Sequence, residues 1–262
     1  MRVVVKLGGR VLDSIEEIAG ELASLASDGV KAIVVHGGGG IVDSYSRRMG
    51  VEPRYVVSPQ GIRSRYTSRE ELEVYVMVMR GLVSARIVSS LQRAGLRALG
   101  VSGLDLGSVV AERKERIVVV NERGRLQVIP GGYTGRIVKV EESSIRGLLR
   151  LADVLVVSPI ASGPGYVPLN VDGDQMAAEI AAALGCRLVM VADVEGVIIG
   201  GSIVRGLSAA EALRLAGSVG EGMNRKLVMA ARAVQKGAPR AIIGSPPIRD
   251  LYESRRGTVI HG

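Results

Sequence analysis

Three glycine-flanked stretches that lie far apart in the chain carry charges suited to phosphate chemistry. They occupy residues 6–9 (Lys-Leu-Gly-Gly), 170–174 (Asn-Val-Asp-Gly-Asp) and 222–226 (Gly-Met-Asn-Arg-Lys). Two lysines, a carboxylate and the bare N–H groups of glycine loops are the groups that stabilise a phosphoryl group as it passes between two anions. Together, the three stretches predict phosphoryl transfer.

The first stretch follows an apolar run that predicts a buried strand. Lys6 stands at the end of this strand, where burial without a partner is unfavourable, so we expect its ammonium group to reach an anion beyond the sheet edge. Gly8 and Gly9 then allow the backbone to approach a phosphate closely. Taken alone, a strand-ending lysine beside a tight turn is an equally good interpretation.

A fourth stretch, residues 36–40 (His-Gly-Gly-Gly-Gly), offers backbone amides but no cation. Gly37, Gly38 and Gly39 precede a predicted helix, and successive amides at a helix N-terminus form an anion-binding nest. The spacing matches neither a Walker A loop nor a dinucleotide fingerprint. We expect His36 to be a packed, hydrogen-bonded residue rather than a catalyst, because no serine or cysteine partner is evident.

The remaining polar candidates flank predicted helices. Arg63 and Arg65 lie in a polar loop, and an arginine fork holds a carboxylate as a lysine cannot. Asn170 and Asp174 precede an alanine-rich helix, where Asp174 fits both an N-cap and a partner of cationic groups. Lys226 begins another helix, where the macrodipole opposes a cation unless an anion lies between them.

Two further acidic stretches have simple alternatives. Asp172 and Asp174 resemble part of a metal loop, but the later ligands of a calcium hand are lacking, so the sequence predicts no metal site built by the protein. Asp193 and Gly196 follow another apolar strand and could hold a ribose, although a turn explains them equally well.

Apolar runs alternate with helical patterns, which predicts an α/β fold, specifically an αβα sandwich with a mainly parallel, open sheet. Strands are expected at residues 3–7, 32–35, 98–101, 154–157, 187–191 and 240–243. Helices are expected at residues 14–27, 68–95, 175–184 and 224–236, with Ser-x-x-Glu capping boxes at Ser14, Ser68 and Ser208. Residues 116–140 add β-hairpin insertions, with strands at 118–120 and 126–129. Ligands of such sheets bind at the carboxyl ends of the strands, where the glycine stretches also fall.

Composition bounds the class of protein. The 262 residues are 47% hydrophobic with a mean hydropathy of +0.27, and without Phe or Trp the aliphatic residues must fill the core. The longest apolar runs have strand length, so no membrane partner is expected, and no leader precedes the first strand. The single cysteine, Cys186, predicts a buried inert thiol. These features indicate a soluble, cytoplasmic protein, and no linker divides residues 1–262.

The net charge of +8 allows a nucleic-acid partner, yet the basic residues are dispersed among acids and seven tyrosines are the only aromatic residues. We therefore predict no nucleic-acid partner. A solvated basic surface, an anionic small molecule or an acidic protein partner explains the charge as well.

The ordered motifs Lys-x-Gly-Gly, His-Gly-Gly-Gly, Gly-Ile-Arg, Asn-x-Asp-x-Asp, Asp-x-x-Gly-Val and Gly-Met-x-x-Lys resemble the amino acid kinase family, and acetylglutamate kinases in particular. In acetylglutamate kinases Val-Thr closely follows the arginine, whereas here Ser64 and Arg65 intervene. This departure, with residues 111–114 and 130–135, resembles the archaeal and thermophile branch that acts on amino acids tethered to the acidic carrier protein LysW. The resemblance implies phosphorylation of the side-chain carboxylate of LysW-carried aminoadipate or glutamate by ATP and Mg²⁺, in lysine and arginine biosynthesis.

The resemblance also implies roles for single residues. Lys6 and Lys226 would flank the transferring phosphoryl group, and Asp174 would orient both lysines. The acceptor would be held by Gly37, Gly38, Gly39, Arg63 and Asn170, and the nucleotide by Gly8, Gly9, Asp193 and Gly196. Within one domain, residues 1–160 would form roughly the amino-acid lobe and residues 161–262 the ATP lobe, with Mg²⁺ held mainly by phosphate oxygens. A homodimer is implied as well.

Three alternatives remain open. The chain could phosphorylate free acetylglutamate, and the loop around Arg63 and Arg65 is the feature that discriminates against this. It could be another member of the family, such as a uridylate or carbamate kinase. It could also be a non-catalytic nucleotide-binding or nucleic-acid-binding module, against which the joint presence of Lys6, Asp174 and Lys226 argues.

Overall fold

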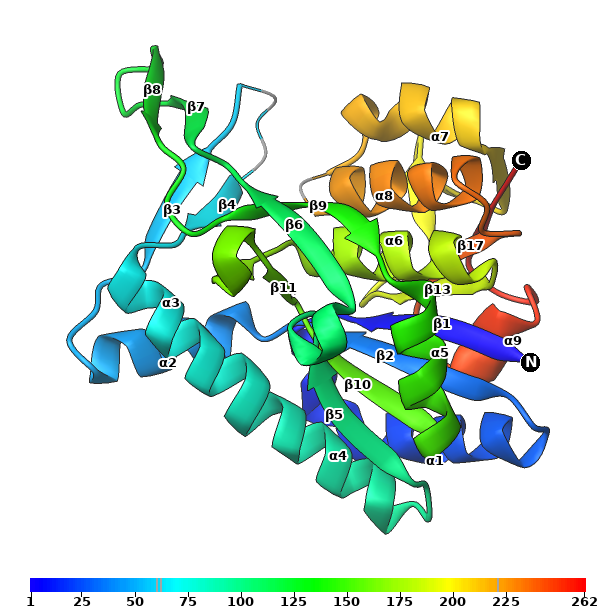
Figure 1. Ribbon diagram of the computed structural model, residues 1–262. Coiled ribbons are helices and arrows are strands. Elements are labelled where there is room, and N and C mark those ends of the chain that lie inside the picture. Colours follow the sequence, from blue (N-terminus) through cyan, green and yellow to red (C-terminus); the bar gives the residue numbers. More distant parts are fainter. Residues whose placement is uncertain (60, 62, 221) are drawn as a thin grey trace.

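The centre of the molecule is an eight-stranded, mainly parallel sheet (Figure 1). The computed structural model describes residues 1–59, 61, 63–220 and 222–262. Only β17 and β18 pair antiparallel in this sheet. Its strands, in spatial order, are β16 (Gly206–Ser208), β18 (Thr258–His261), β17 (Ala241–Gly244), β13 (Arg187–Val191), β1 (Arg2–Leu7), β2 (Lys31–His36), β10 (Val154–Ser158) and β5 (Ala98–Ser102). The predicted α/β class and the mainly parallel sheet are confirmed.

Each face of the sheet carries its own hydrophobic core, because successive side chains of a strand point to opposite faces. Val4 and Ile33 belong to one core, whereas Val3, Val5 and Val34 belong to the other. Burial on both faces explains why the central strands read as unbroken apolar runs. Strands from the first 160 residues and from the later part of the chain form this one sheet.

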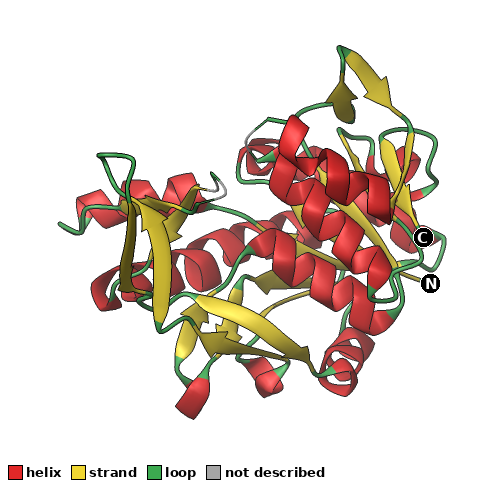
Figure 2. Ribbon diagram, turned by 90° about the horizontal axis from the view of Figure 1, so that it is seen from above, coloured by secondary structure: helices red, strands yellow, loops and turns green. Residues whose placement is uncertain are grey.

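Helices cover both faces and complete the αβα sandwich (Figures 1 and 2). One core contains buried residues of α5, α6, α7 and α8, and the other contains residues of α1, α2, α4, α9 and the segment before α4. The helices are α1 (Ile15–Ser27), α2 (Gly39–Arg48), α3 (Arg69–Val76), α4 (Ser84–Arg93), α5 (Glu142–Leu151), α6 (Gly173–Leu184), α7 (Ala209–Leu215), α8 (Met223–Gln235) and α9 (Ile248–Tyr252).

The three predicted capping boxes have different outcomes. At Ser208 the box is complete, because its side chain and that of Glu211 each accept a backbone N–H of the other residue. At Ser68 only the forward bond forms, from Glu71 N at 3.2 Å. Ser14 precedes α1 without a side-chain cap, so that prediction is wrong, since a 3₁₀ turn (Arg10–Ser14) leads directly into the helix.

A continuous helix runs from Arg69 to Arg93 through a π-helical segment, Met77–Val83. By length and composition alone this helix could cross a membrane, which the strand length of the unbroken apolar runs does not exclude. Half of its most apolar window is buried within the fold, where Met79, Val83 and Ile87 pack into a core. This burial is that of a core helix.

Smaller sheets project from the sandwich. One contains β3 (Arg54–Val57), β4 (Arg63–Tyr66), β7 (Arg116–Val120) and β8 (Leu126–Pro130), and it confirms the predicted hairpin near residue 120. A second contains β12 (Pro168–Asn170), β11 (Ile160–Ser162), β6 (Val109–Arg113) and β9 (Gly135–Val140). A further hairpin joins β14 (Val197–Ile199) and β15 (Ser202–Val204). The first two of these sheets lie on the same side of the main sheet, where Figure 1 labels β4 and β6.

Candidate active site

The first two glycine stretches meet because β1 and β2 are neighbouring parallel strands. Leu7 pairs with His36 at the strand ends, and Gly37 N donates to Leu7 O over 2.9 Å. A Cβ atom on Gly37 would lie 3.0 Å from Gly9 N, so the two loops approach closely and a side chain there would require the backbone to shift by a few tenths of an ångström. The predicted convergence at the carboxyl edge of the sheet is thereby confirmed.

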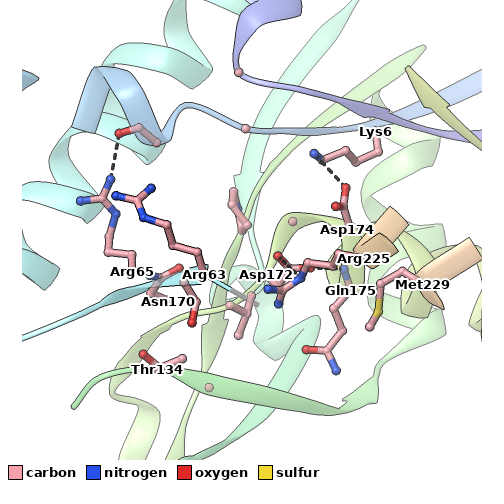
Figure 3. Close-up of a pocket in the computed structure, with 18 of the residues that line it drawn as sticks. Lys6, Arg63, Arg65, Thr134, Asn170, Asp172, Asp174, Gln175, Arg225 and Met229 are labelled. Atoms are coloured by element: carbon pink, nitrogen blue, oxygen red, sulfur yellow. Dashed lines mark hydrogen bonds and ion pairs between the residues drawn. The ribbon is translucent and has the colours of Figure 1, made fainter. Parts of the chain in front are cut away.

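Two ammonium groups share one carboxylate at this edge, and Figure 3 shows one of them, that of Lys6, beside Asp174. Lys6 Nζ, from the end of β1, lies 2.8 Å from Asp174 Oδ1. Lys226 Nζ, from the first turn of α8, lies 3.3 Å from both oxygens of the same carboxylate. The structure therefore brings together three residues that are separated by up to 220 positions in the sequence, as phosphoryl transfer requires.

The three groups shift one another's protonation. Burial opposes the charge on Lys6, but attraction to Asp174 is stronger in sum and raises the pKa of Lys6. Burial, and then repulsion from Lys6, lower the pKa of Lys226 despite its contact with Asp174. Burial also disfavours the Asp174 carboxylate, yet the two lysines hold its pKa below the ordinary value. The site therefore keeps its carboxylate ionised.

The start of α6 differs from the prediction at one position. Asp172, not Asp174, is the N-cap, because its side chain accepts Gln175 N over 2.8 Å. Asp174 lies in the first turn, which frees its carboxylate for the two lysines. Asp172 also lies 3.0 Å from Nε of Arg225, a cationic partner that the sequence analysis quoted without a role.

The glycine nest depends on backbone shape. Gly38 has φ +152°, which L side chains rarely adopt, and a Cβ there would lie 2.9 Å from Sδ of Met79. Gly39 and Gly40 form the first residues of α2. The N-terminus of α2 is therefore open toward the cavity beside Gly37, Gly38 and Gly39.

His36 is buried and hydrogen-bonded, as expected. Its Nδ1 lies 2.9 Å from Gly37 O and its Nε2 lies 3.0 Å from Ser158 Oγ. Burial lowers the pKa of His36 to about 4, so the ring is neutral at pH 7. Ser158 Oγ also lies 3.2 Å from Met79 O, which links the end of β2 to the π-helical segment behind Gly38.

The two arginines of β4 (Figure 3) both contact Tyr55 but otherwise differ in their partners. Arg65 is bound by Glu71, by Asp43 at 2.6 Å and by the carbonyl oxygen of Gly39 at 2.9 Å. Arg63 is exposed, lines the cavity and stacks over the Tyr55 ring at 3.6 Å. The interpretation of both arginines as carboxylate forks in a loop therefore applies at most to Arg63. Arg65 lies on a strand, and its guanidinium already binds groups of the protein itself.

Asn170 closes the opposite wall. Its Nδ2 donates to Thr67 Oγ1 over 2.8 Å, and its backbone N donates to Tyr133 O over 2.9 Å. Thr67 is fully buried and was not singled out from the sequence. Because Asn170 is tied on both sides, its amide oxygen is held in a fixed direction.

These groups line a cavity of about 790 Å³. Lys6, Gly9, Arg63, Asn170 and Asp174 line it together with the glycine nest, and Arg225 and Arg232 of α8 line its other part. Lys226 is not itself part of the lining, and it contacts the lining through its ion pair with Asp174. Among the described residues, Gly8, Asp193 and Gly196 are not part of this lining. The Gly-Ile-Arg motif is described only at Gly61 and Arg63, because Ile62 lies outside the described residues.

Gly196 has a packing reason of its own. A Cβ there would lie 2.9 Å from both Ile203 Cγ2 and Thr258 Oγ1. Glycine at 196 therefore allows β14 to pack against the end of the sheet, and its predicted contact with nucleotide stays a prediction, as does that of Asp193.

The cavity carboxylates do not fit a metal ion held by the protein alone. Within the described ranges, no group of three or more His, Cys, Asp or Glu side chains could hold a metal ion. Asp172 and Asp174 face the cavity, but Arg225 and the two lysines already engage them.

Comparisons with known proteins agree with this geometry. A sequence model described as the Amino acid kinase family matches residues 1–245. A protein of Metallosphaera sedula named [LysW]-aminoadipate/[LysW]-glutamate kinase is 48% identical over 98% of this chain and 99% of its own. A protein of the same name from Saccharolobus solfataricus is 48% identical over 98% of both chains, and an Aeropyrum pernix protein, provisionally given that name, is 54% identical over 98% of this chain and 96% of its own.

Solved structures share the fold at low sequence identity. The smu.665 protein of Streptococcus mutans has a TM-score of 0.81 at 19% identity and covers 99% of this chain and 98% of its own. The Giardia carbamate kinase has a TM-score of 0.69 at 17% identity, with 99% and 98% covered. With the family match over most of its length, the chain belongs to the amino acid kinase family, whose members are phosphotransferases.

Proposed function

We propose that the protein transfers the γ-phosphoryl group of ATP to the side-chain carboxylate of aminoadipate or glutamate carried by LysW, giving an acyl phosphate. The observation that carries the proposal is the convergence of Lys6 and Lys226 on Asp174 beside a glycine nest. The acceptor follows from the names of relatives that are 45–54% identical over nearly the whole chain. These names favour neither free acetylglutamate nor uridylate.

The reacting carboxylate is placed at the nest of Gly37, Gly38 and Gly39. A carboxylate is already ionised at pH 7, so the attack on phosphorus needs no general base. The acceptor's α-carboxylate is assigned to Arg63, whose guanidinium is exposed to the cavity. Asn170 binds beside it, because its amide is fixed by Thr67 and faces the same space.

The two lysines neutralise the negative charge of the phosphoryl group during its transfer. Their ammonium groups meet at one carboxylate, so the oxygens of a transferring phosphoryl group can contact both at once. Asp174 keeps both amines charged and aimed at that point, a positioning role rather than a chemical one. The transfer is direct, in line, and forms no covalent enzyme intermediate.

The nucleotide is placed over the C-terminal part of the cavity, next to α8. The Arg225 and Arg232 side chains line this part, and Gly8, Gly9, Asp193 and Gly196 stay predicted nucleotide contacts. Mg²⁺ would enter on the phosphate oxygens and would neutralise part of their charge, since the cavity carboxylates are already paired. The lobe division, the homodimer, the cytoplasmic location and the absence of a nucleic-acid or membrane partner remain predictions.

The decisive experiment compares acceptors. The purified protein is incubated with ATP, Mg²⁺ and LysW-linked glutamate, LysW-linked aminoadipate, free N-acetylglutamate or uridylate. Turnover of every acceptor is measured as ADP release, and any acyl phosphate is trapped with hydroxylamine. We expect hydroxamate only from the carrier-linked acceptors, and its loss in Lys6→Met and Lys226→Met but not in Lys139→Met, whose exposed lysine pairs with Glu141. Comparable turnover of free N-acetylglutamate would refute carrier dependence, and turnover of uridylate alone would refute the acceptor class.

A further inference from the structure

The cavity holds more positive charge than the proposed reaction has used. Its lining includes Lys6, Arg63, Arg65, Lys114, Arg225 and Arg232, against the carboxylates of Asp172 and Asp174. Asp174 pairs with Lys6, Asp172 pairs with Arg225, and acids outside the lining bind Arg65. Arg232 lies on α8, in the part assigned to the nucleotide. Two cations, Arg63 and Lys114, are left for the acceptor.

Lys114 is held in place relative to the acceptor-binding residues. It lies between β6 and β7, and its backbone N donates to Thr134 O over 2.9 Å. The same short segment bonds on its other side to the acceptor wall, because Tyr133 N donates to Thr67 O over 2.8 Å and Asn170 N donates to Tyr133 O over 2.9 Å. The backbone of Lys114 is therefore connected to that of Asn170 through the hydrogen bonds of residues 133–134.

A glycine makes this close approach feasible. A Cβ on Gly131 would lie 1.7 Å from the carbonyl oxygen of Lys114, so no side chain fits at residue 131. Gly131 N in turn donates to Glu115 O over 2.9 Å. A Cβ on Gly132, which has φ +61°, would lie 2.3 Å from Thr67 O. The two glycines at 131–132 thus allow this loop to pack against the backbone of Lys114 on one side and of Thr67 on the other. Backbone hydrogen bonds hold the loop in this position.

Among the described residues, no carboxylate forms an ion pair with the Lys114 ammonium group. The residue is exposed and lines the cavity. Burial around the amine, and then repulsion from Arg225, lower the pKa of Lys114, which Asp172 offsets only in part. A bound anion would stabilise the charged form of Lys114.

We propose that Lys114 binds a third carboxylate of the acceptor, carried by the group that blocks the amino end of the glutamate or aminoadipate. The inference rests on the proposed function and specifies its substrate class: an acceptor with three carboxylates, of which one reacts at the glycine nest, one binds Arg63 and one binds Lys114. Free N-acetylglutamate has no third carboxylate, so Lys114 gives the site a charge-based means of rejecting it.

Two small compounds isolate that carboxylate. N-succinylglutamate and N-butyrylglutamate have acyl groups of the same length, and only the first ends in a carboxylate. Calorimetric titration of the wild-type protein should show at least tenfold tighter binding of N-succinylglutamate. Lys114→Met should abolish this preference by weakening N-succinylglutamate alone, whereas Lys139→Met should keep it. Equal affinities in the wild type, binding of neither compound, or a preserved preference in Lys114→Met would each overturn the inference.

Kinetics with the carrier-linked acceptor separate this inference from the proposed function. Lys114→Met should raise the KM for LysW-linked glutamate at least tenfold and leave the KM for ATP and the thermal unfolding midpoint unchanged. A larger effect on ATP would assign Lys114 to the nucleotide and overturn the inference. If the wild type does not phosphorylate carrier-linked glutamate at all, the proposed function fails, while the calorimetric comparison still decides whether Lys114 binds a carboxylate.

Discussion

The substitution Asp174→Asn tests the reasoning about the paired lysines most directly. It keeps the size of the side chain and removes the charge that Lys6 and Lys226 share. Asparagine at residue 174 can still accept hydrogen bonds from both amines, so the geometry is conserved better than in an alanine variant. The perturbation is therefore mainly electrostatic.

Its size follows from the contacts. The amines lie 2.8 Å and 3.3 Å from the same oxygen, Asp174 Oδ1. Adding these contacts limits the separation of the two nitrogens to about 6 Å, at which two unit charges repel by about 3 kcal/mol in an effective dielectric of ~20. Without the carboxylate this repulsion favours a neutral amine by roughly a hundredfold. Lys226, whose pKa is already lowered, is the lysine that should lose its proton.

The assay is the pH dependence of kcat with carrier-linked glutamate at saturating ATP. We expect Asp174→Asn to lower kcat at every pH and to lower it further as the pH rises, because a neutral Lys226 no longer stabilises the phosphoryl group. Asp172→Asn is the matched control, since it removes a charge two residues away whose partner is Arg225. Asp172→Asn should change the affinity for the substrates and the capping of α6, but it should not steepen the fall of kcat at alkaline pH. A profile of Asp174→Asn parallel to that of the wild type would refute the proposed role of the carboxylate.

Three further predictions concern the walls of the cavity. Arg65→Met should lower the free energy of unfolding by about 3–5 kcal/mol in urea titrations, because it leaves buried Glu71 unpaired. Arg63→Met should change the free energy of unfolding by less than about 0.5 kcal/mol and raise the acceptor KM roughly 10- to 100-fold. The reverse pattern would contradict the division of roles between the two arginines. Gly38→Ala should reduce kcat at least about tenfold, as expected for misplaced oxyanion donors, because its Cβ meets Met79 Sδ, whereas Gly40→Ala, with nothing within 4 Å, should not; equal losses would show that the nest is not shape-limited. Because the pKa of buried His36 falls to about 4, only the unfolded state takes up its proton between pH 6.5 and 4, so stability should drop by about 3 kcal/mol over that range; His36→Gln should flatten this part of the curve, and an unchanged slope would assign the acid sensitivity to other groups.

The sequence predicted the edge of the sheet well, because local signals determine it. Unbroken apolar runs specify buried parallel strands, and glycines at their ends specify loops without side chains. Parallel neighbours end at the same edge, so Lys6, His36 and the glycine nest had to lie together once β1 and β2 were adjacent. Cys186 is buried with its pKa raised to about 11, which agrees with the predicted inert thiol.

The partners of the polar side chains could not be predicted in the same way. Glu71 stands three residues after Ser68, a spacing that predicts a reciprocal capping box. In the fold its carboxylate instead meets Arg65. A charge-assisted bond to a buried guanidinium is stronger than one to a backbone N–H, so Glu71 pairs with Arg65 and does not complete the capping box. Asp43 and Gly39, which complete the network, belong to another helix, and no spacing in the sequence announces them.

This network gives Arg65 a consequence for the nest that spacing alone would not suggest. Nη2 of its guanidinium donates both to the carbonyl oxygen of Gly39 and to the Asp43 carboxylate of the same helix. Arg65 thus fixes the first turn of α2, whose N-terminus forms part of the anion nest, while Arg63 on the same strand stays free to bind the acceptor. The two arginines stand at i and i+2 and therefore share one face of β4. Under the proposed function, one strand would couple the position of the acceptor's α-carboxylate to the position of the amides proposed to receive its reacting carboxylate, so a shift of β4 should change acceptor affinity and kcat together.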